Sequence, residues 1–442
     1  MLDRRPIESV VDLIDPEVQR LCRMTVEEAR RRVGDGSPGR VAEIDGSFAL
    51  VAVAKDGTTV RMARSLDRPM RYFLAKRAEG PALVVSDRID AIRDFLAARG
   101  LASQFHPSYT RMVPAHHVVE IRLVGCPDPD ASHTRFFAPE RGVFERDVDA
   151  LGRRYVGALA AEIEKWLSRL PDGAPIGVCF SGGVDSGAVF LTIYKLLSGP
   201  GANLGRLKAF TLSLDGGEDV TQARAFLKSL DLDLFLEPVE MPAEAADPLA
   251  AVAVIEDYKP LDVECAAMAL ALCRGIRERY PDWTYLADGD GGDENLKDYP
   301  IEENPELTLK SVLNNAMLYQ EGWGVGTFKH SRIYSGGQSR ACTRTYAPLR
   351  RYGFEGFSPF TRPAVIAAAE GIPFAELTGW DPERLYALKG EIVARGVRQV
   401  IGFDMPVFPK RRFQHGALPA RERGRLAGTE ADYRSHFASL YS

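Results

Sequence analysis

Residues 176–190 combine the side-chain types that bind a phosphate group. The stretch reads Ile-Gly-Val-Cys-Phe-Ser-Gly-Gly-Val-Asp-Ser-Gly-Ala-Val-Phe, an apolar run followed by glycines, serines and an aspartate. The apolar run predicts a buried strand, and the apolar periodicity of residues 189–197 predicts a helix after the glycines. Because the first N–H groups of a helix lack partners and carry partial positive charge, such a turn favours an anion.

Each polar residue of this turn has a defined use beside a phosphate. Ser181 and Ser186 can donate hydroxyl hydrogen bonds to it. Gly182 and Gly183 let the backbone approach the anion, and Asp185 can hold Mg²⁺ against it. The turn has neither the lysine nor the spacing of a G-x-x-x-x-G-K-S/T loop. It resembles the pyrophosphate-binding loop of ATP pyrophosphatases, which adenylate a substrate and release pyrophosphate. The alternative is a glycine turn without a ligand.

A second loop, residues 288–294, follows a predicted strand at 284–287 and reads Asp-Gly-Asp-Gly-Gly-Asp-Glu. Its spacing, and the lack of a glutamate at the twelfth position, exclude a calcium loop of the EF-hand type. Loops that leave the carboxyl ends of parallel strands open on the same crevice of a sheet. We therefore expect this loop to form a second wall of the nucleotide site, the alternative being a surface turn.

Together, the two loops resemble the synthetase domain of the asparagine synthetase family, which includes β-lactam synthetases and lasso-peptide cyclases. The resemblance implies ATP and Mg²⁺ as cofactors, with Asp185 and Asp293 as the metal ligands. It also implies that Asp288 and Gly289 lie beside the adenylate, and that the nucleotide is contacted at Leu212.

Three further residues are assigned from the same resemblance. Asp290 stands where asparagine synthetases have a glutamate and β-lactam synthetases a tyrosine; it could take a proton from an attacking amine, or be a structural loop residue. Lys410, within residues 405–413, matches the lysine that stabilises charge during adenylation and amide formation; a solvated basic run is the alternative. Glu264 aligns with an arginine that binds the substrate carboxylate in asparagine synthetases, which predicts a pocket for a cationic group.

Alternating strand and helix patterns position these residues. A helix is predicted over residues 147–170. Further strands are predicted at 207–214 and 234–240, and further helices at 220–230, 248–258 and 265–280. The alternation predicts an α/β fold with a doubly wound parallel sheet. The resemblance makes it a HUP-like ATP-pyrophosphatase domain spanning residues 141–442. Beyond residue 300 the pattern is mostly helical, and 353–360 resembles a family segment ending in Pro-Phe-Asp, with Thr361 in place of the aspartate.

Residues 1–140 form a smaller, mainly β domain. Hairpin pairs are predicted at 46–54 with 60–64 and at 71–75 with 82–86, then a helix at 88–98 and a strand at 116–122. Residues 44–51 and 65–72 resemble the later half of the family's glutaminase domain, an N-terminal-nucleophile fold.

A working glutaminase of that family needs a cysteine directly after the initiator methionine. This chain has Leu2 there, and its first cysteine, Cys22, falls in a polar stretch that looks helical. The resemblance therefore implies a degenerate α+β remnant without glutaminase activity, serving as a scaffold or dimer surface.

Composition restricts the partners and the location. The chain has 442 residues, 45% of them hydrophobic and 26% charged, with a net charge of −5. This balance argues against nucleic acid as the main partner. Without a membrane span or a signal core we expect a cytoplasmic protein. The scattered cysteines predict buried reduced thiols, and His116–His117 predicts strand surface rather than a metal site.

These features predict an ATP-dependent, AMP-forming ligase. It would join a carboxylate of a small amino-acid-like substrate to ammonia or an amine through an acyl-adenylate. The alternatives are an intramolecular cyclase of the β-lactam synthetase type, an enzyme that attaches sulfur through adenylation, and a non-catalytic nucleotide-binding relative. The sequence leaves open the substrates, the source of nitrogen (free ammonia, a substrate amine or a partner subunit) and whether the chain forms a homodimer.

Overall fold

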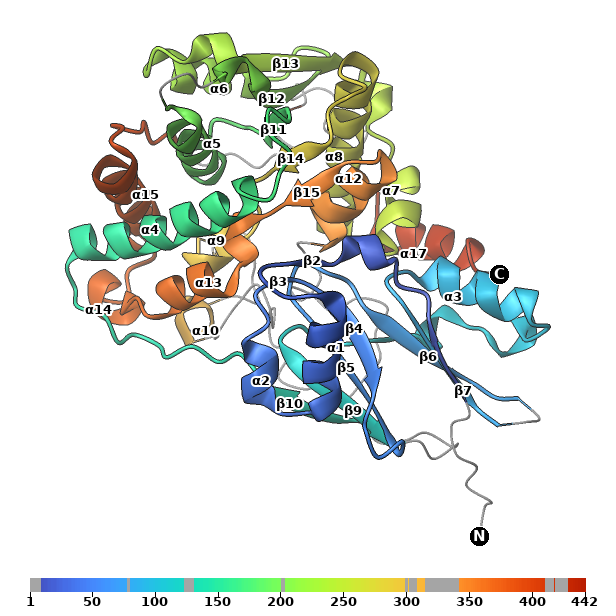
Figure 1. The fold of residues 1–442 in the computed structure, drawn as a ribbon. Coiled ribbons are helices and arrows are strands. Elements are labelled where there is room, and N and C mark those ends of the chain that lie inside the picture. The colour runs from blue at the N-terminus through green and yellow to red at the C-terminus, as the bar shows by residue number, and fades with distance from the viewer. Residues whose placement is uncertain are drawn as a thin grey trace. The chain divides into compact units, whose positions relative to one another are not determined.

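The computed structural model describes residues 9–77, 80–122, 131–199, 203–298, 301, 308–314, 342–409, 417 and 428–442. Lys410 and Leu2 lie outside the described residues. The chain divides into two compact units (Figure 1). Unit 1 consists of Met1–Ala138, Gly324–Cys342 and Phe437–Ser442, and unit 2 of Pro139–Trp323 and Thr343–His436.

Unit 2 is built on a five-stranded sheet in which all neighbouring strands are parallel. The strands are β11 (Ile176–Cys179), β12 (Leu207–Leu214), β13 (Leu236–Met241), β14 (Tyr285–Ala287) and β15 (Glu355–Phe357). Their order across the sheet is β13-β12-β11-β14-β15, which Figure 1 shows from top to bottom. The sheet confirms the predicted α/β class, although β15 was not predicted.

The strand order reverses between β11 and β14. From β11 the chain adds β12 and β13 on one side, and it then returns to add β14 and β15 on the other. In open α/β sheets such a reversal leaves a crevice at the carboxyl ends of the two central strands, where ligands bind. The two predicted nucleotide loops leave the sheet at these two strand ends.

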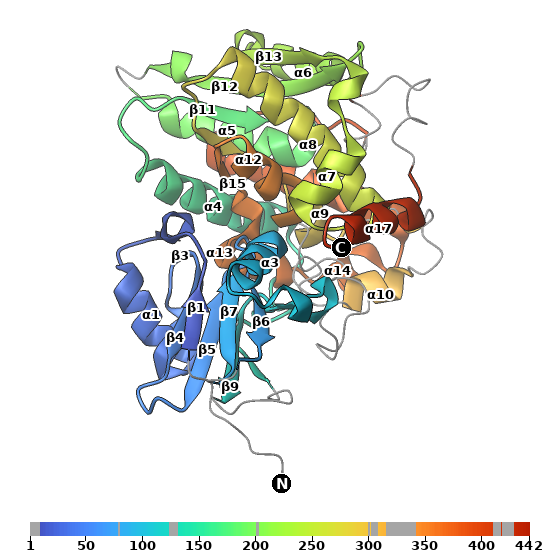
Figure 2. The same ribbon diagram turned by 90° about the vertical axis from the view of Figure 1, so that its right-hand side faces the viewer.

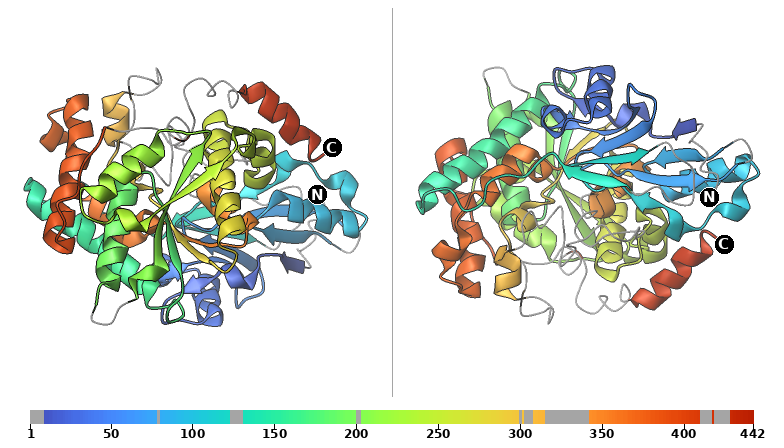
Figure 3. Two further views of the ribbon diagram at one scale, coloured as in Figure 1. Left: turned by 90° about the horizontal axis from the view of Figure 1, so that it is seen from above. Right: turned by 90° about the horizontal axis from the view of Figure 1, so that it is seen from below.

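Helices cover both faces of this sheet (Figure 3, left). On one face lie α5 (Val184–Leu197), α6 (Asp219–Lys228) and α4 (Val148–Leu167), with α13 (Pro363–Glu370) and α15 (Pro382–Gly396) packed on α4. On the other face lie α8 (Pro260–Arg279), α7 (Pro248–Ile255) and α12 (Ala347–Arg351). The described residues also form α9 (Gly292–Asn295), α10 (Leu309–Asn314), α14 (Phe374–Thr378), α17 (Glu430–Ser439) and the π-helical turns Cys342–Tyr346 and Val397–Ile401.

Two helix boundaries differ from the predictions for local reasons. α7 ends three residues early because Glu256 takes a left-handed conformation with φ of 53°. α8 begins at Pro260, five residues before the predicted start, because proline fits the first helical turn. Asp247 caps α7: its carboxylate accepts hydrogen bonds from the N–H groups of Leu249 at 2.9 Å and Ala250 at 3.1 Å.

Unit 1 contains two four-stranded sheets. One has the order β1 (Ser9–Asp12), β7 (Ala82–Ser86), β6 (Arg71–Ala75), β8 (Arg111–Met112). The other has the order β10 (Ser132–Arg135), β9 (His117–Arg122), β5 (Thr59–Arg64), β4 (Ala49–Val53), and β2 (Arg20–Leu21) pairs with β3 (Gly46–Ser47). Both predicted hairpin pairs are antiparallel as expected.

Alternating side chains make unit 1 a four-layer α/β/β/α arrangement. Val51 and Leu83 pack in the core between the sheets. Leu50 packs on the outer side with α1 (Val26–Asp35) and α2 (Pro38–Ala42), and Val84 packs on the other outer side with α3 (Ile89–Ala98). Figure 2 shows β1, β7 and β6 side by side. Both faces of both sheets are therefore covered.

This double coverage overturns the prediction for the histidine pair. His116 and His117 are buried, because β9 is an interior strand with apolar layers on each face. The His116 ring meets the Phe137 ring edge-on at 4.8 Å between centroids, and His117 Nδ1 lies 2.7 Å from the Ala115 carbonyl oxygen. Burial lowers the pKa of His117 to about 4, so its ring is neutral in the folded protein.

The stretch around Cys22 also differs from the prediction. Cys22 precedes α1, and its N–H donates to the Asp45 carbonyl at 2.8 Å. The helix begins only at Val26, where Thr25 and Glu28 form a capping box. Cys273 is a buried thiol whose pKa burial raises, in agreement with the prediction, whereas Cys22, Cys179 and Cys265 are only partly buried. None of the described helices has the length and apolar character needed to cross a membrane.

Candidate functional site

The first loop is a short connection that places its polar residues on a helix N-terminus. β11 ends at Cys179 and α5 begins at Val184 with Gly183 as its N-cap. Asp185 and Ser186 therefore lie in the first turn of α5. The helix thus begins before residue 189, where the predicted apolar periodicity starts. The Gly183 N–H donates to Ser181 Oγ at 3.3 Å.

Position 182 needs a glycine because of both its backbone conformation and the lack of space for a Cβ atom. Its φ of 71° lies in the left-handed region, and a Cβ atom there would lie 2.9 Å from the backbone of Ala223 in α6. The Gln222 side chain also donates to the Ser181 carbonyl at 3.3 Å. α6 thus packs against the loop and fixes its path.

The two serines of this loop face each other. Ser186 Oγ lies 3.2 Å from Ser181 Oγ and accepts a hydrogen bond from the Ser181 N–H at 3.3 Å. Hydroxyl hydrogens rotate, so either group can donate to an anion placed at the helix N-terminus. The loop therefore offers the hydroxyl and backbone donors expected of a phosphate cradle.

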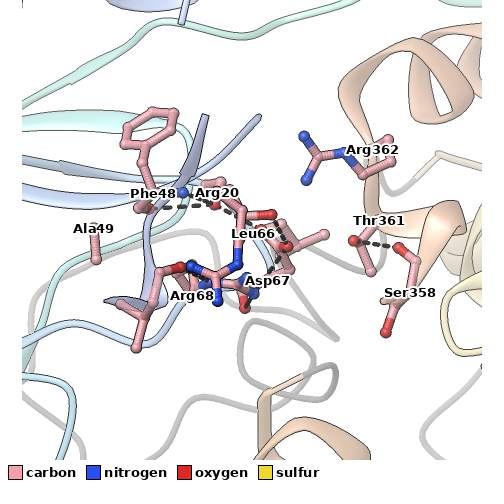
Figure 4. Close-up of polar contacts among 12 residues, drawn as sticks. Arg20, Phe48, Ala49, Leu66, Asp67, Arg68, Ser358, Thr361 and Arg362 are labelled. Atoms are coloured by element: carbon pink, nitrogen blue, oxygen red, sulfur yellow. Dashed lines mark hydrogen bonds and ion pairs between the residues drawn. The ribbon is translucent and has the colours of Figure 1, made fainter. Parts of the chain in front are cut away.

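The second loop is shaped by a buried carboxylate. Asp288 Oδ1 accepts from the Asp290 N–H at 3.0 Å, and Oδ2 accepts from Ser358 Oγ at 2.9 Å. Burial raises the pKa of Asp288 well above its ordinary value. The segment after β15 completes this support: Thr361 Oγ1 donates to the Ser358 carbonyl at 2.7 Å (Figure 4), and Asn295 Nδ2 donates to the Phe360 carbonyl at 2.9 Å.

Glycines in the second loop let it approach the first. A Cβ atom on Gly289 would lie 2.9 Å from the Ser186 nitrogen and 3.1 Å from Asp185 Cβ. A Cβ atom on Gly292 would collide with the Asp185 carboxylate. The structure therefore places the two loops side by side, with Asp185 enclosed between them.

A lysine that the sequence reasoning missed joins the two loops. Lys389 in α15 is buried, and its Nζ lies 2.6 Å from Asp185 Oδ2 and 3.3 Å from Asp298 Oδ2, and also contacts Asp293 Oδ1. The signal that could have found it is its place within the apolar stripe of α15, one helical turn from Leu385. A lysine at such a position is rarely buried unless it is paired.

The charges in this group shift one another's pKa values. Burial raises the pKa of Asp185 to about 7, although Lys389 opposes the shift. Burial also disfavours the Lys389 ammonium, but Asp185, Asp293 and Asp298 together hold its pKa well above the ordinary value. Within the described part of the chain, no group donates a hydrogen bond to Asp185 Oδ1.

The carboxylate oxygens of this group suit a magnesium ion that is bound together with phosphate. Asp185 and Asp293 come from different loops yet bind the same ammonium, so their oxygens converge on one position for a cation. Among the described residues, no cluster of three or more His, Cys, Asp or Glu side chains could hold a metal ion on its own. Mg²⁺ usually takes only one or two carboxylates and completes its shell with phosphate and water.

Asp290 faces a second group of charges next to the loops. Its Oδ2 accepts from Thr345 Oγ1 at 2.5 Å. Burial raises its pKa, and Arg344 opposes the shift. The Arg344 guanidinium donates to Glu294 Oε1 at 3.2 Å and lies 3.9 Å from Asp262 Oδ1. Sequence reasoning missed both Arg344 and Asp262.

Two other predicted residues have different surroundings in the structure. Burial raises the pKa of Tyr433 and the partly buried Glu264 of α8 adds to this shift, whereas Asp262 of the same helix lies near Arg344. Leu212 is buried in β12 and pairs with Val239 of β13.

Unit 1 has a polar network of its own around Asp67. Asp67 accepts hydrogen bonds from Ser47 Oγ at 2.5 Å and Ser65 Oγ at 2.6 Å. Arg68 donates to the Asp67 carboxylate at 3.1 Å and to the Val18 carbonyl at 2.7 Å (Figure 4). These contacts stay within unit 1 and connect its strands and turns.

Comparison with known proteins gives a match for the part of the chain that contains both loops. No curated protein matches the chain. Residues 164–341 match the family model described as asparagine synthase. This match supports, for that part of the chain, an ATP-dependent ligase domain of the asparagine synthetase type that forms amide bonds.

Proposed function

We propose that this chain activates the carboxylate of a small amino-acid-like substrate as an acyl-adenylate and then joins it to ammonia or an amine. One observation carries the proposal: Asp185 from the first loop and Asp293 from the second bind the same ammonium at the switch point of the sheet. The two loops share one position for a cation, and this position lies next to a helix N-terminus. Such a site is suited to a nucleoside triphosphate and its metal.

The first loop would hold the leaving pyrophosphate. Gly182 and Gly183 would present backbone N–H groups, and Ser181 and Ser186 would present hydroxyls, at the N-terminus of α5. Asp185 and Asp293 would hold Mg²⁺, which neutralises phosphate charge when it is bound. Asp288 and Gly289 would line the adenylate, and strand β12 would contact the nucleotide at Leu212.

The chemistry would take two steps. A substrate carboxylate oxygen attacks the α-phosphorus of ATP, and the bond to pyrophosphate breaks. An amine nitrogen then attacks the acyl carbon, AMP leaves, and the amine gives up a proton. Asp290 is the proposed base for that proton, because it lies in the second loop and burial raises its pKa above the ordinary value of an aspartate. Lys410, outside the described residues, would stabilise the negative charge that develops in both steps.

The acidic residues beside Asp290 favour a substrate that carries a cationic group. Asp262 and Glu294 flank Arg344, and Asp262 belongs to the same helix, α8, as Glu264. A substrate amine in this pocket could also attack its own adenylate, which is the cyclase alternative. The mass of the product separates the two outcomes, since a cyclase product gains no atoms from ammonia.

We also propose that unit 1 is a scaffold without glutaminase activity. The hydrogen bonds of Asp67 and Arg68 join strands and turns of unit 1 itself, which is consistent with a structural use of that segment. Nitrogen would then come from ammonia, a substrate amine or a separate protein.

Exchange of radiolabelled pyrophosphate into ATP tests the proposal, with a panel of amino and diamino acids as substrates. Wild type should exchange with at least one acid, and Asp293→Ala should lose this exchange. Asp290→Asn should keep the exchange but lose amide formation. Asp172→Ala is the matched control, because Asp172 is exposed at the opposite, amino end of β11. Exchange that survives Asp293→Ala would contradict the assignment of the metal site.

A further inference from the structure

The ammonium of Lys389 occupies the point where the carboxylates of the two loops converge. Its Nζ lies 2.6 Å from Asp185 Oδ2 and 3.3 Å from Asp298 Oδ2, and it contacts Asp293 Oδ1. The residue is only 5% exposed. The ammonium donates hydrogen bonds to Asp185 and Asp293 and forms an ion pair with Asp298, so three carboxylates surround it.

Both carboxylate oxygens of Asp185 are occupied or covered in this arrangement. Oδ2 accepts from Lys389, and Oδ1 is buried against Gly292, where a Cβ atom would collide with it. A magnesium ion needs an oxygen at about 2.1 Å. Oδ1 offers no such contact because it is buried, and a cation on Oδ2 would be repelled by the neighbouring ammonium while Lys389 is in place.

The backbone that carries Lys389 has little room to retreat. α15 packs on α4 through glycines, and a Cβ atom on Gly152 would lie 2.6 Å from the Ile392 carbonyl oxygen and 2.8 Å from the Gly396 nitrogen. Only rotation of the lysine side chain can therefore move the ammonium. Because the group is buried, it needs another anion as a partner when it moves.

We propose that Lys389 is a built-in counterion that keeps a free divalent cation off Asp185 and Asp293 until the nucleotide arrives. The proposal rests on the metal site of the proposed function. Phosphate oxygens supply both the missing ligands of the metal and new acceptors for the ammonium. Metal and nucleotide then enter together, and each strengthens the binding of the other.

Binding of Mn²⁺ to the full-length protein, measured by electron paramagnetic resonance of the free ion, tests this proposal. Wild type should bind Mn²⁺ weakly alone and tightly with ATP. Without ATP, Lys389→Met should bind Mn²⁺ at least about tenfold more tightly than wild type, the factor that corresponds to one charged hydrogen bond. Lys195→Met controls for net charge, since it removes an exposed lysine near the end of α5, and it should match wild type.

Further variants keep the result interpretable. Adding Asp293→Asn to Lys389→Met should abolish the gained Mn²⁺ site. Lys389→Gln retains a hydrogen-bond donor and replaces Lys389→Met if that variant does not fold, which thermal unfolding shows. Equal Mn²⁺ affinity of wild type and the Lys389 variants without ATP would overturn the proposal. A failure of the proposed metal site gives a different result: with ATP, Mn²⁺ would bind wild type and Asp293→Asn equally.

Discussion

A buried ion pair behind the second loop gives a direct test of how unit 2 holds its site. Lys297 is 1% exposed, and its Nζ lies 3.2 Å from Glu370 Oε1. Arg141 Nε donates to the other oxygen of Glu370 at 3.1 Å. Lys297 also has a φ of 59°, in the left-handed region, and it precedes Asp298, which pairs with Lys389. The pair therefore fixes a strained turn that ends at the site.

Glu370→Gln removes the charge partner and leaves the Lys297 ammonium buried. Breaking a buried ion pair by removing one partner costs about 3–5 kcal/mol, because the remaining charge is uncompensated. Arg141 is half exposed and keeps the Leu313 carbonyl as an acceptor, so it adds little to the loss. We expect urea unfolding to show a fall of about 3–5 kcal/mol in the free energy of unfolding. Glu376→Gln, on the exposed side of α14, should cost less than about 0.5 kcal/mol.

The double variant Lys297→Met/Glu370→Met distinguishes the cost of one unmatched charge from a general disturbance of the site. Replacing both charges with apolar groups of similar volume is often close to neutral, so the double variant should recover most of the stability lost in Glu370→Gln. A double variant as unstable as the single one would refute the reasoning, and so would a single variant that loses less than about 1 kcal/mol.

Two further predictions concern the first loop and unit 1. Gly182→Ala should lower the free energy of unfolding by about 1–2 kcal/mol or more and weaken ATP binding, because its left-handed φ is combined with the collision at Ala223. Gly379→Ala shares the left-handed φ without a neighbour within 4 Å, so it should leave ATP binding unchanged. The folded pKa of His117, about 4, lies below its unfolded value, so the unfolded chain binds the extra proton as pH falls from about 6.5 to 4. Wild type should lose up to about 3 kcal/mol of unfolding free energy across this range, and His117→Gln should not; equal slopes in the two proteins would contradict this.

Local patterns were sufficient for most elements of the parallel sheet. β12 matches its predicted range, and α4 and α7 begin within one residue of their predicted starts, because apolar runs and capping residues act within a few positions. β15 was missed because it has only three residues and forms through pairing with β14, far away in the sequence. The histidine pair was placed wrongly because alternation does not reveal an interior strand of a sheet covered on both faces.

The site shows the same division between local and distant information. The serines, glycines and aspartates of the two loops stand in short motifs that can be read directly from the sequence. Lys389 could not be assigned in this way, because its partners Asp185 and Asp293 lie 204 and 96 positions away. Only its place among the apolar residues of α15 marks it as unusual. Packing of α15 on α4 brings it to the loops, and no local pattern encodes that packing.

The segment from Asp293 to Asp298 is held by two buried lysines. Lys389 binds the carboxylates at both of its ends, and Lys297, inside the segment, binds Glu370. The Asp298 N–H also donates to the Asp293 carbonyl at 2.9 Å, which closes the turn. Moving this loop would break several buried ion pairs at once, which is costly. When a nucleotide binds, we therefore expect the Lys389 side chain to move, while the carboxylates stay in place to bind the positive charge of the metal.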